Sequence, residues 1–187
     1  MSLKQSYNGI PAIEIKAFLE EKFLQYNNPS FIDSDPISIP HGFLEDHDRE
    51  ISGFLTAAIA WGRRDLILRS SRLMMELMDN SPYEFIMAAS ENDFSRFSRF
   101  VHRTFNGTDC IYFLKGLRHI YSNFASMEDV VLQGMKDSGS VKEGLSHLRL
   151  TFFSLHHALR NEKHFADVTG GAAGKILNIF LRSIEVA

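Results

Sequence analysis

The chain has almost no cysteine: Cys110 is alone among 187 residues, so no disulfide can form within it. A chain of this kind suits a reducing compartment, and we expect a cytoplasmic protein. No apolar run approaches the ~20 residues needed to cross a bilayer. The segment from Met1 to Ile10 also lacks the apolar core of a signal peptide. We therefore expect neither a membrane protein nor a disulfide-stabilised secreted domain.

Alternation of apolar and polar residues with period two is nearly absent, so the sequence predicts no β-strand. No internal repeat is found either. With 44% hydrophobic and 23% charged residues, the composition is that of an ordinary globular domain. Helix start and stop signals divide the chain into about eight helices. We expect an all-α single domain over residues 1–187, with an N-terminal helix and proline-rich loop (1–45), central helices (46–137) and C-terminal helices (138–187).

Capping and helix-breaking residues place the expected helices. Ser81-Pro82-Tyr83-Glu84 is the clearest start, because it combines a capping box with proline at the first helical position. A second capping box begins at Ser140 and starts a helix expected to reach Gly170. Thr108 is expected to cap a helix reaching about Phe124. Prolines keep residues 28–41 irregular. The other predicted helices cover about 11–27, 46–61, 63–79 (with Leu66, Leu73 and Leu77 facing inwards), 91–103, a short stretch from 126, and 172–185.

Residues 33–48 are rich in carboxylate and histidine side chains. The segment from Asp33 fails as an EF-hand loop, because Ile37 and Ser38 stand where an oxygen donor and a glycine are required. His47 and Asp48 are adjacent and diverge, so capping and solvated charge explain them better than a metal site. We predict no metal and no cofactor.

An enzyme of unidentified class is one hypothesis for this region. Asp35, His41 and Asp48 are the candidate catalytic residues, with Arg63 beside them. Acid–base chemistry requires these side chains to converge in one cleft.

Gly170-Gly171-Ala172-Ala173-Gly174-Lys175 is similar to a phosphate-binding loop. A Walker A loop has the pattern G-x-x-x-x-G-K-[ST]. Here the outer glycines stand one residue too close, and Ile176 follows the lysine, so nucleotide hydrolysis is not expected. A weaker alternative is that backbone N–H groups at this helix start contact a phosphate oxygen. Close helix packing is the plainer interpretation.

Arginine and phenylalanine interleave in residues 94–103. On a helix, Phe94, Phe97 and Val101 would share one face. The arginines at 96, 99 and 103 would line the neighbouring face and could follow a phosphate backbone. An ordinary amphipathic helix with a charged exterior is the alternative. The candidate nucleic-acid contacts in the whole chain are Arg63, Arg64, Arg96, Arg99, Arg103, Lys175 and Arg182.

The last predicted helix carries Ile179, Phe180 and Ile184 on one face. If that face is exposed, it would pack on a partner or on a second copy of the chain. DNA or RNA and a homo-oligomer through the C-terminal helix are thus the two predicted kinds of partner. A membrane is not expected as a partner.

The block from Phe31 to His41 is specific enough to be recognisable. It resembles a bacterial family of unknown function found in Bacteroidetes-type bacteria. The likeness continues through Asp48-Arg49-Glu50-Ile51, Ala57-Ala58-Ile59-Ala60-Trp61-Gly62-Arg63, His102-Arg103-Thr104-Phe105-Asn106-Gly107-Thr108-Asp109 and Gly144-Leu145-Ser146-His147.

The later part of that family distantly resembles the helix-hairpin-helix DNA glycosylases. Lys175 to Arg182 is similar to a family helix, with Ile176 where the family tends to have arginine and Ser183 in place of a tryptophan. The family segment that bears an aspartate at the place of the glycosylases' catalytic acid is missing from this sequence, which ends at Ala187.

A base-excising enzyme needs such a carboxylate. The resemblance therefore implies a non-catalytic helical module, similar to the N-terminal part of a glycosylase-like fold, that binds nucleic acid weakly. A structural or protein-interaction domain is the alternative.

Overall fold

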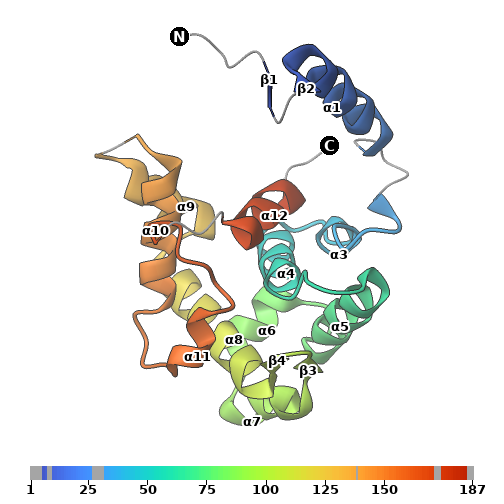
Figure 1. The fold of residues 1–187 in the computed structure, drawn as a ribbon. Coiled ribbons are helices and arrows are strands. Elements are labelled where there is room, and N and C mark those ends of the chain that lie inside the picture. Colours follow the sequence, from blue (N-terminus) through green and yellow to red (C-terminus); the bar gives the residue numbers. More distant parts are fainter. Residues whose placement is uncertain (1–5, 8–9, 27–31, 138, 171–173, 185–187) are drawn as a thin grey trace. The chain divides into compact units, whose positions relative to one another are not determined.

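The computed structural model describes residues 6–7, 10–26, 32–137, 139–170 and 174–184. Contacts within the chain divide it into two compact units, residues 1–35 and 36–186. Helices make up most of the described residues, and the only other regular elements there are four two-residue strands (Figure 1). The prediction of an all-α class is confirmed, whereas the prediction that no strand forms is wrong.

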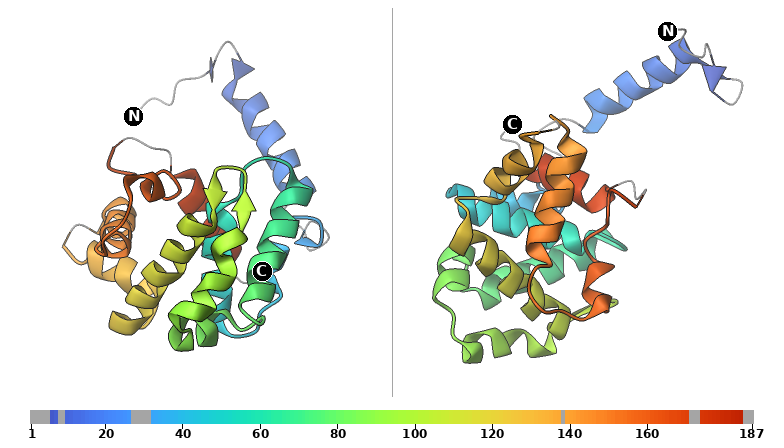
Figure 2. Two further views of the ribbon diagram at one scale, coloured as in Figure 1. Left: turned by 90° about the horizontal axis from the view of Figure 1, so that it is seen from below. Right: turned by 90° about the vertical axis from the view of Figure 1, so that its left-hand side faces the viewer.

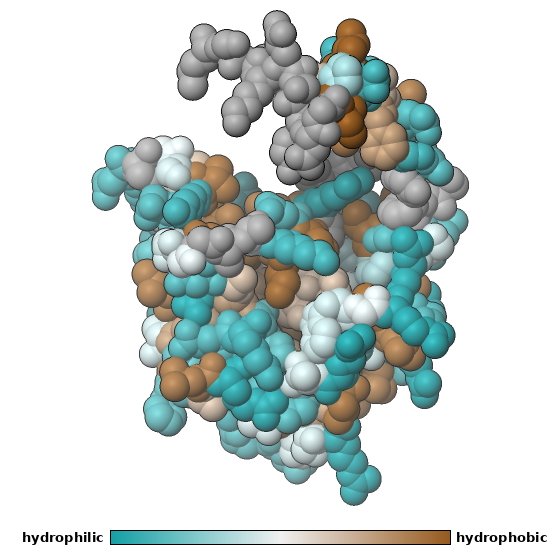
Figure 3. All heavy atoms as spheres, in the orientation of Figure 1, coloured by the Kyte–Doolittle hydropathy of each residue, from teal (hydrophilic) through white to brown (hydrophobic). Residues whose placement is uncertain are grey.

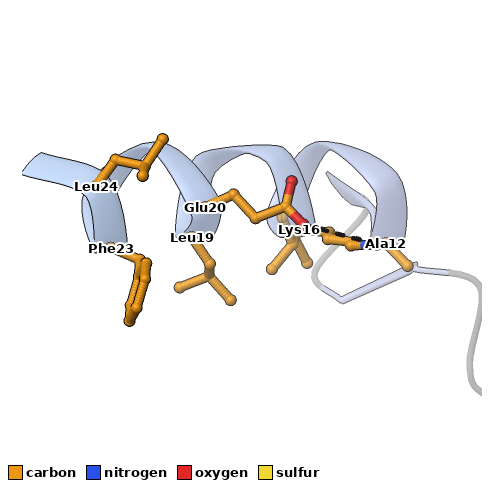
Figure 4. A pocket seen from close by; sticks show the side chains of 7 residues that line it. Ala12, Lys16, Leu19, Glu20, Phe23 and Leu24 are labelled. Carbon is orange, nitrogen blue, oxygen red and sulfur yellow. Dashed lines mark ion pairs between the residues drawn. The ribbon is translucent and has the colours of Figure 1, made fainter. Parts of the chain in front are cut away.

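The smaller unit contains one long helix. Strands β1 (Ser6–Tyr7) and β2 (Ile10–Pro11) pair antiparallel, and α1 (Ala12–Tyr26) follows at once. A pocket along α1 is lined by seven residues between Ala12 and Leu24, and Lys16 and Glu20 form an ion pair at 3.6 Å on it (Figure 4). All these residues belong to one helix, so the pocket is an apolar helix side rather than an enclosed site.

Helix α4 is the centre of the larger unit (Figure 1). All its residues from Glu50 to Ala58 are buried, as expected of a helix that is covered on every side. The rings of Phe113, Phe152, Phe165 and Phe180 lie 5.3–5.9 Å from that of Phe54. The elements packed on it include α3 (Ser38–His41), α5 (Arg64–Leu77), α6 (Pro82–Ala88) and α12 (Lys175–Ile184), with α4 itself spanning Asp46–Ala58.

The remaining elements complete the larger unit. They are α7 (Glu91–Phe94), η1 (Ser95–Arg99), β3 (Val101–His102), β4 (Phe105–Asn106), α8 (Gly107–Asn123), α9 (Met127–Met135), α10 (Val141–Phe152) and α11 (Leu159–Glu162). Helices α9 and α10 lie side by side in both Figure 1 and Figure 2. A Cβ on Gly144 would lie 2.6 Å from the Val131 carbonyl oxygen, so glycine permits this close approach.

Several helix starts differ from the predicted caps. Ser81 makes no side-chain capping bond; instead the Tyr83 N–H of α6 donates to Asp48 Oδ1 of α4 at 2.7 Å. Ser140 likewise makes no side-chain capping bond to α10. Helix α8 is capped by Asn106 rather than Thr108, because Asn106 Oδ1 accepts the N–H groups of the next turn at 3.1 and 3.2 Å.

Helix α5 buries a different face from the one predicted. Leu66 and Leu73 are 40% and 43% exposed, and Leu77 is half-buried. The buried residues of the helix and its C-cap are Ile67, Ser71, Met74, Met75 and Met78. These also follow helical spacing, and their methionines adapt well to an irregular core.

The chain between residues 91 and 103 is not one helix. It forms α7, tightens into η1, and becomes extended at Phe100 before β3. Phe94 and Phe97 are buried as predicted, but Val101 is 66% exposed. One helical turn, α3, also forms inside the stretch predicted to be irregular.

The C-terminal region also departs from the prediction. The helix expected from residue 140 ends at Phe152, and α11 follows after a break. Phe180 of α12 is only 2% exposed because it packs against α4, so it cannot belong to an exposed apolar face. The Ile184 side chain lies outside the described residues. In the described part of the chain, no helix is both long and apolar enough to cross a membrane.

The surface of the larger unit is mixed in character. Hydrophilic side chains cover much of the face seen in Figure 3, and hydrophobic ones show in several separate places. Leu44 and Leu159 are examples of exposed apolar residues, at 91% and 83%. Single apolar side chains are ordinary on protein surfaces and do not by themselves mark a partner site.

Candidate nucleic-acid interface

The β3–β4 hairpin presents an arginine at its turn. Val101 pairs with Asn106 and His102 with Phe105, which leaves Arg103 and Thr104 as the connecting residues. Arg103 has φ 56°, in the left-handed region that L-residues other than glycine seldom adopt. The neighbouring Phe105 is fully buried and anchors the hairpin in the core. The backbone of the exposed Arg103 is therefore held at a defined place by a strained turn.

Arg103 lies on the indole ring of Trp61. Its guanidinium carbon is 5.1 Å from the ring centroid, within the range of a cation–π contact. Gly62 lies beside it, and its φ of +109° favours glycine at this position. A Cβ on Gly62 would come within 2.6 Å of Arg103 Nη1, so a larger residue there would displace the guanidinium.

His102 fixes the hairpin against Trp61 and α5. Its Nε2 lies 3.4 Å from the Trp61 carbonyl oxygen, and its Nδ1 lies 2.9 Å from Ser70 Oγ. Since the carbonyl can only accept, Nε2–H is the donor and Nδ1 accepts from the serine hydroxyl. Burial, with a smaller contribution from the Arg103 charge, lowers the pKa of His102. A neutral ring therefore positions the hairpin.

Arg160 approaches the hairpin turn from α11. Its Nη2 donates to the Thr104 carbonyl oxygen at 3.2 Å and to Asp109 Oδ2 at 2.8 Å. The Arg160 side chain is 42% exposed, whereas Asp109 is fully buried. One arginine thus connects the turn to a buried carboxylate.

Asp109 joins three segments beneath the hairpin. Besides Arg160, it accepts hydrogen bonds from the Asn106 N–H at 3.0 Å and from Asn161 Nδ2 at 2.9 Å. His164 Nε2 is 3.5 Å from Asp109 Oδ2. Burial lowers the pKa of His164, against the opposing effect of the Asp109 charge. This network makes the start of α8 a rigid support for the hairpin.

Arg63 lies next to Gly62 and is paired locally. Its Nε and Nη2 donate to the two carboxylate oxygens of Asp65 at 3.1 and 2.7 Å. These bonds hold the pKa of Asp65 below its usual range. Both residues are exposed, so the pair is open to exchange with another anion. We call Trp61, Gly62, Arg63, Arg103, Thr104 and Arg160 the hairpin surface.

The other predicted basic contacts are not on one helical face. Arg96 donates to Asp79 at 3.0 Å and to Asp93 at 3.1 Å, so its charge is already paired. Arg99 is exposed at the end of η1, on a different element from Arg103. The predicted row of three arginines on one helix is therefore wrong, because the chain leaves helical geometry at Phe100.

Three further basic candidates remain. Arg64 is exposed at the start of α5, next to Arg63. Lys175 and Arg182 are exposed on α12. Among the residues that the structure describes, no hydrogen bond or ion pair engages the Lys175 or Arg182 side chain.

The candidate catalytic residues fall in two units. Asp35 belongs to the smaller unit, whereas His41, Asp48 and Arg63 belong to the larger one. Asp48 is engaged with the Tyr83 N–H. Within the described ranges, no hydrogen bond or ion pair links Asp48 to His41 or to Arg63.

Two other sequence hypotheses concern ligands. No group of three or more His, Cys, Asp or Glu side chains in the described part of the chain could hold a metal ion. The proposed phosphate contact at residues 170–175 falls partly outside the description, because 171–173 are not described. Gly174, just after that gap, is buried with φ +60°.

Four residues of the hairpin surface, together with His102, were missed as site residues by sequence reasoning. Trp61, Gly62, His102 and Thr104 were recognised only within blocks of family likeness, and Arg160 gave no signal. Arg160 reaches Thr104 only through the fold, since the two residues lie far apart in the chain. The signal that was available was a Trp-Gly pair followed by two arginines, and a His-Arg pair elsewhere in the chain.

The chain belongs to the family described as protein of unknown function (DUF2400), whose model matches residues 35–184. The match includes every residue of the hairpin surface. No curated protein matches the chain, and no solved structure does.

Proposed function

We propose that the chain is a non-catalytic nucleic-acid-binding module that contacts the phosphate backbone through the hairpin surface. The observation that carries the proposal is the placement of Arg103. A strained turn holds this arginine, its guanidinium lies on Trp61, and no carboxylate in the described part of the chain pairs with it. A positive charge held ready but unpaired is suited to a phosphate group.

The charge balance of the hairpin surface predicts weak binding. Arg63, Arg103 and Arg160 supply three positive charges, and Asp65 and Asp109 supply two negative ones, which leaves one positive charge. Non-specific nucleic-acid binding depends on such charges and weakens as salt rises. The chain as a whole carries a formal charge of −3, so the interaction must be local.

The basic residues outside the hairpin surface differ in how strongly they are proposed to contact nucleic acid. Arg64 and Arg99 are near neighbours in sequence of the hairpin surface and are proposed as secondary contacts. Arg96 is not proposed, since two aspartates hold it. Lys175 and Arg182 are retained only through the sequence resemblance of their helix to the glycosylases.

Binding of a labelled oligonucleotide, followed by fluorescence anisotropy, tests the proposal. For one or two neutralised phosphates, raising the salt from about 50 to about 200 mM should weaken duplex binding about 3.5- to 12-fold. Arg103→Glu should abolish most of the binding at low salt. Asp65→Asn should strengthen binding several-fold, because it releases Arg63 from its carboxylate partner.

Two charge variants serve as matched controls. Lys142→Glu changes an exposed charge on α10, and Arg96→Ala removes an arginine that is already paired. Both should bind as the unaltered chain does. No binding at low salt and micromolar protein would end the proposal and leave the alternative of a structural or protein-interaction domain.

A further inference from the structure

Trp61 is the only tryptophan in the chain, and it is half-buried in the hairpin surface. The His102 ring meets it edge-on at 5.7 Å, and the Arg103 guanidinium lies on its ring at 5.1 Å. The indole is therefore fixed by the fold, while a flexible charged side chain covers it.

Arg103 is held on Trp61 only loosely. In the described part of the chain, its side chain makes no hydrogen bond and no ion pair, and the residue is exposed. The side chain fills the space beside Gly62, where any other residue would put a Cβ. If the guanidinium moves away, this space opens next to the indole.

We infer that Trp61 is a stacking site for an unpaired base, so that the hairpin surface prefers single-stranded nucleic acid. On binding, the Arg103 guanidinium moves from the indole to a neighbouring phosphate, and the base takes its place on the ring. This inference rests on the proposed function and adds to it the kind of nucleic acid that is bound.

The chemistry of the exchange favours a single strand over a duplex. Every base has a flat π-face, and its stacking on an aromatic side chain strengthens single-strand binding by about tenfold or more per base. An exposed cation–π contact is weaker than this. The arginine also regains a partner, because a phosphate is a better acceptor than a ring. Within a duplex, neighbouring base pairs cover the faces of each base, so a base there cannot replace Arg103 on the Trp61 ring.

Trp61 itself reports the event. Its fluorescence is the only tryptophan signal of the chain and should be quenched when a base stacks on it. The probes are an oligothymidylate, an oligouridylate, a duplex and an abasic single strand, all about ten nucleotides long. The abasic strand keeps the phosphates but removes the bases. The thymidylate and uridylate arms show whether DNA or RNA is preferred.

We expect the two single strands with bases to bind about tenfold more tightly than the abasic strand and to quench Trp61. Trp61→Ala should lose this advantage while keeping the weak binding to the abasic strand. Trp61→Phe, which preserves an aromatic ring, should retain most of it. Circular dichroism of both variants verifies that the fold persists.

The outcomes separate the two proposals. If no probe binds, the proposed function itself fails. If the duplex and the abasic strand bind as tightly as the single strands and Trp61 is not quenched, phosphate binding stands and base stacking is refuted. If Trp61→Ala is unfolded, the unaltered chain with the abasic strand still decides the question.

Discussion

Removing the Asp109 carboxylate tests the physical account of the network below the hairpin. The side chain is fully buried and accepts three hydrogen bonds at 2.8–3.0 Å, from Arg160, Asn161 and the Asn106 N–H. Breaking a buried ion pair by removing one partner costs about 3–5 kcal/mol. Arg160 is 42% exposed and can turn to water, which reduces the cost. The Asn161 amide left behind is buried and adds to it. We expect about 4 kcal/mol of lost stability for Asp109→Ala.

Urea unfolding followed by circular dichroism measures this loss. With a denaturant slope of about 2 kcal/mol per M, the midpoint should fall by about 2 M. The urea midpoint of Asp109→Asn should lie between those of the unaltered chain and Asp109→Ala, because the amide oxygen of asparagine can still accept a hydrogen bond. Thr108→Ala is the matched control: its exposed neighbouring side chain should change stability by less than about 0.5 kcal/mol. A loss below about 1 kcal/mol for Asp109→Ala would refute the reasoning.

Two further predictions concern other positions. Burial lowers the pKa of His102, so the stability that its neutral ring supports is fully present above about pH 6.5 and declines as the pH falls below that value. His102→Gln should therefore reduce the change in unfolding free energy between about pH 7.5 and 5.5, whereas the exposed control His156→Gln should not. Asp48→Ala should cost about 1 kcal/mol and speed hydrogen exchange at the Tyr83 amide, because that N–H loses its acceptor. Asp46→Ala, an exposed neighbour, should leave the Tyr83 exchange rate unchanged.

Local signals in the sequence were sufficient for the helical class. Proline, glycine and apolar spacing located most helices, because these features act over one or two turns. They were insufficient where a distant segment supplies the missing group. Ser81 has every feature of a cap, yet Asp48 from another helix satisfies the start of α6. Which side chain accepts the N–H groups at a helix start depends on tertiary contacts, and these cannot be derived from one sequence alone.

The candidate site was predictable only in part. The arginines of residues 96–103 were identified as basic, but their placement depended on a helix that ends at η1. The extended turn forms in place of the predicted helix because it buries Phe100 and Phe105 on either side of Arg103. The meeting of Arg103 with Trp61 could not be derived from spacing, since it requires a hairpin and a helix start to come together in three dimensions.

The reactivity of Cys110 reports how often the protein core unfolds. The thiol is fully buried in α8, with Met74 as its sulfur neighbour at 3.9 Å, and burial raises its pKa. A thiol reagent needs both access and the thiolate, so the folded molecule should be protected from it. Labelling can then proceed only as fast as the core exposes α8, and its rate measures that event without any substitution in the chain. Cys110 has no role in the proposed binding, yet its labelling rate reports how often α8, the helix that supports the β3–β4 hairpin, unfolds.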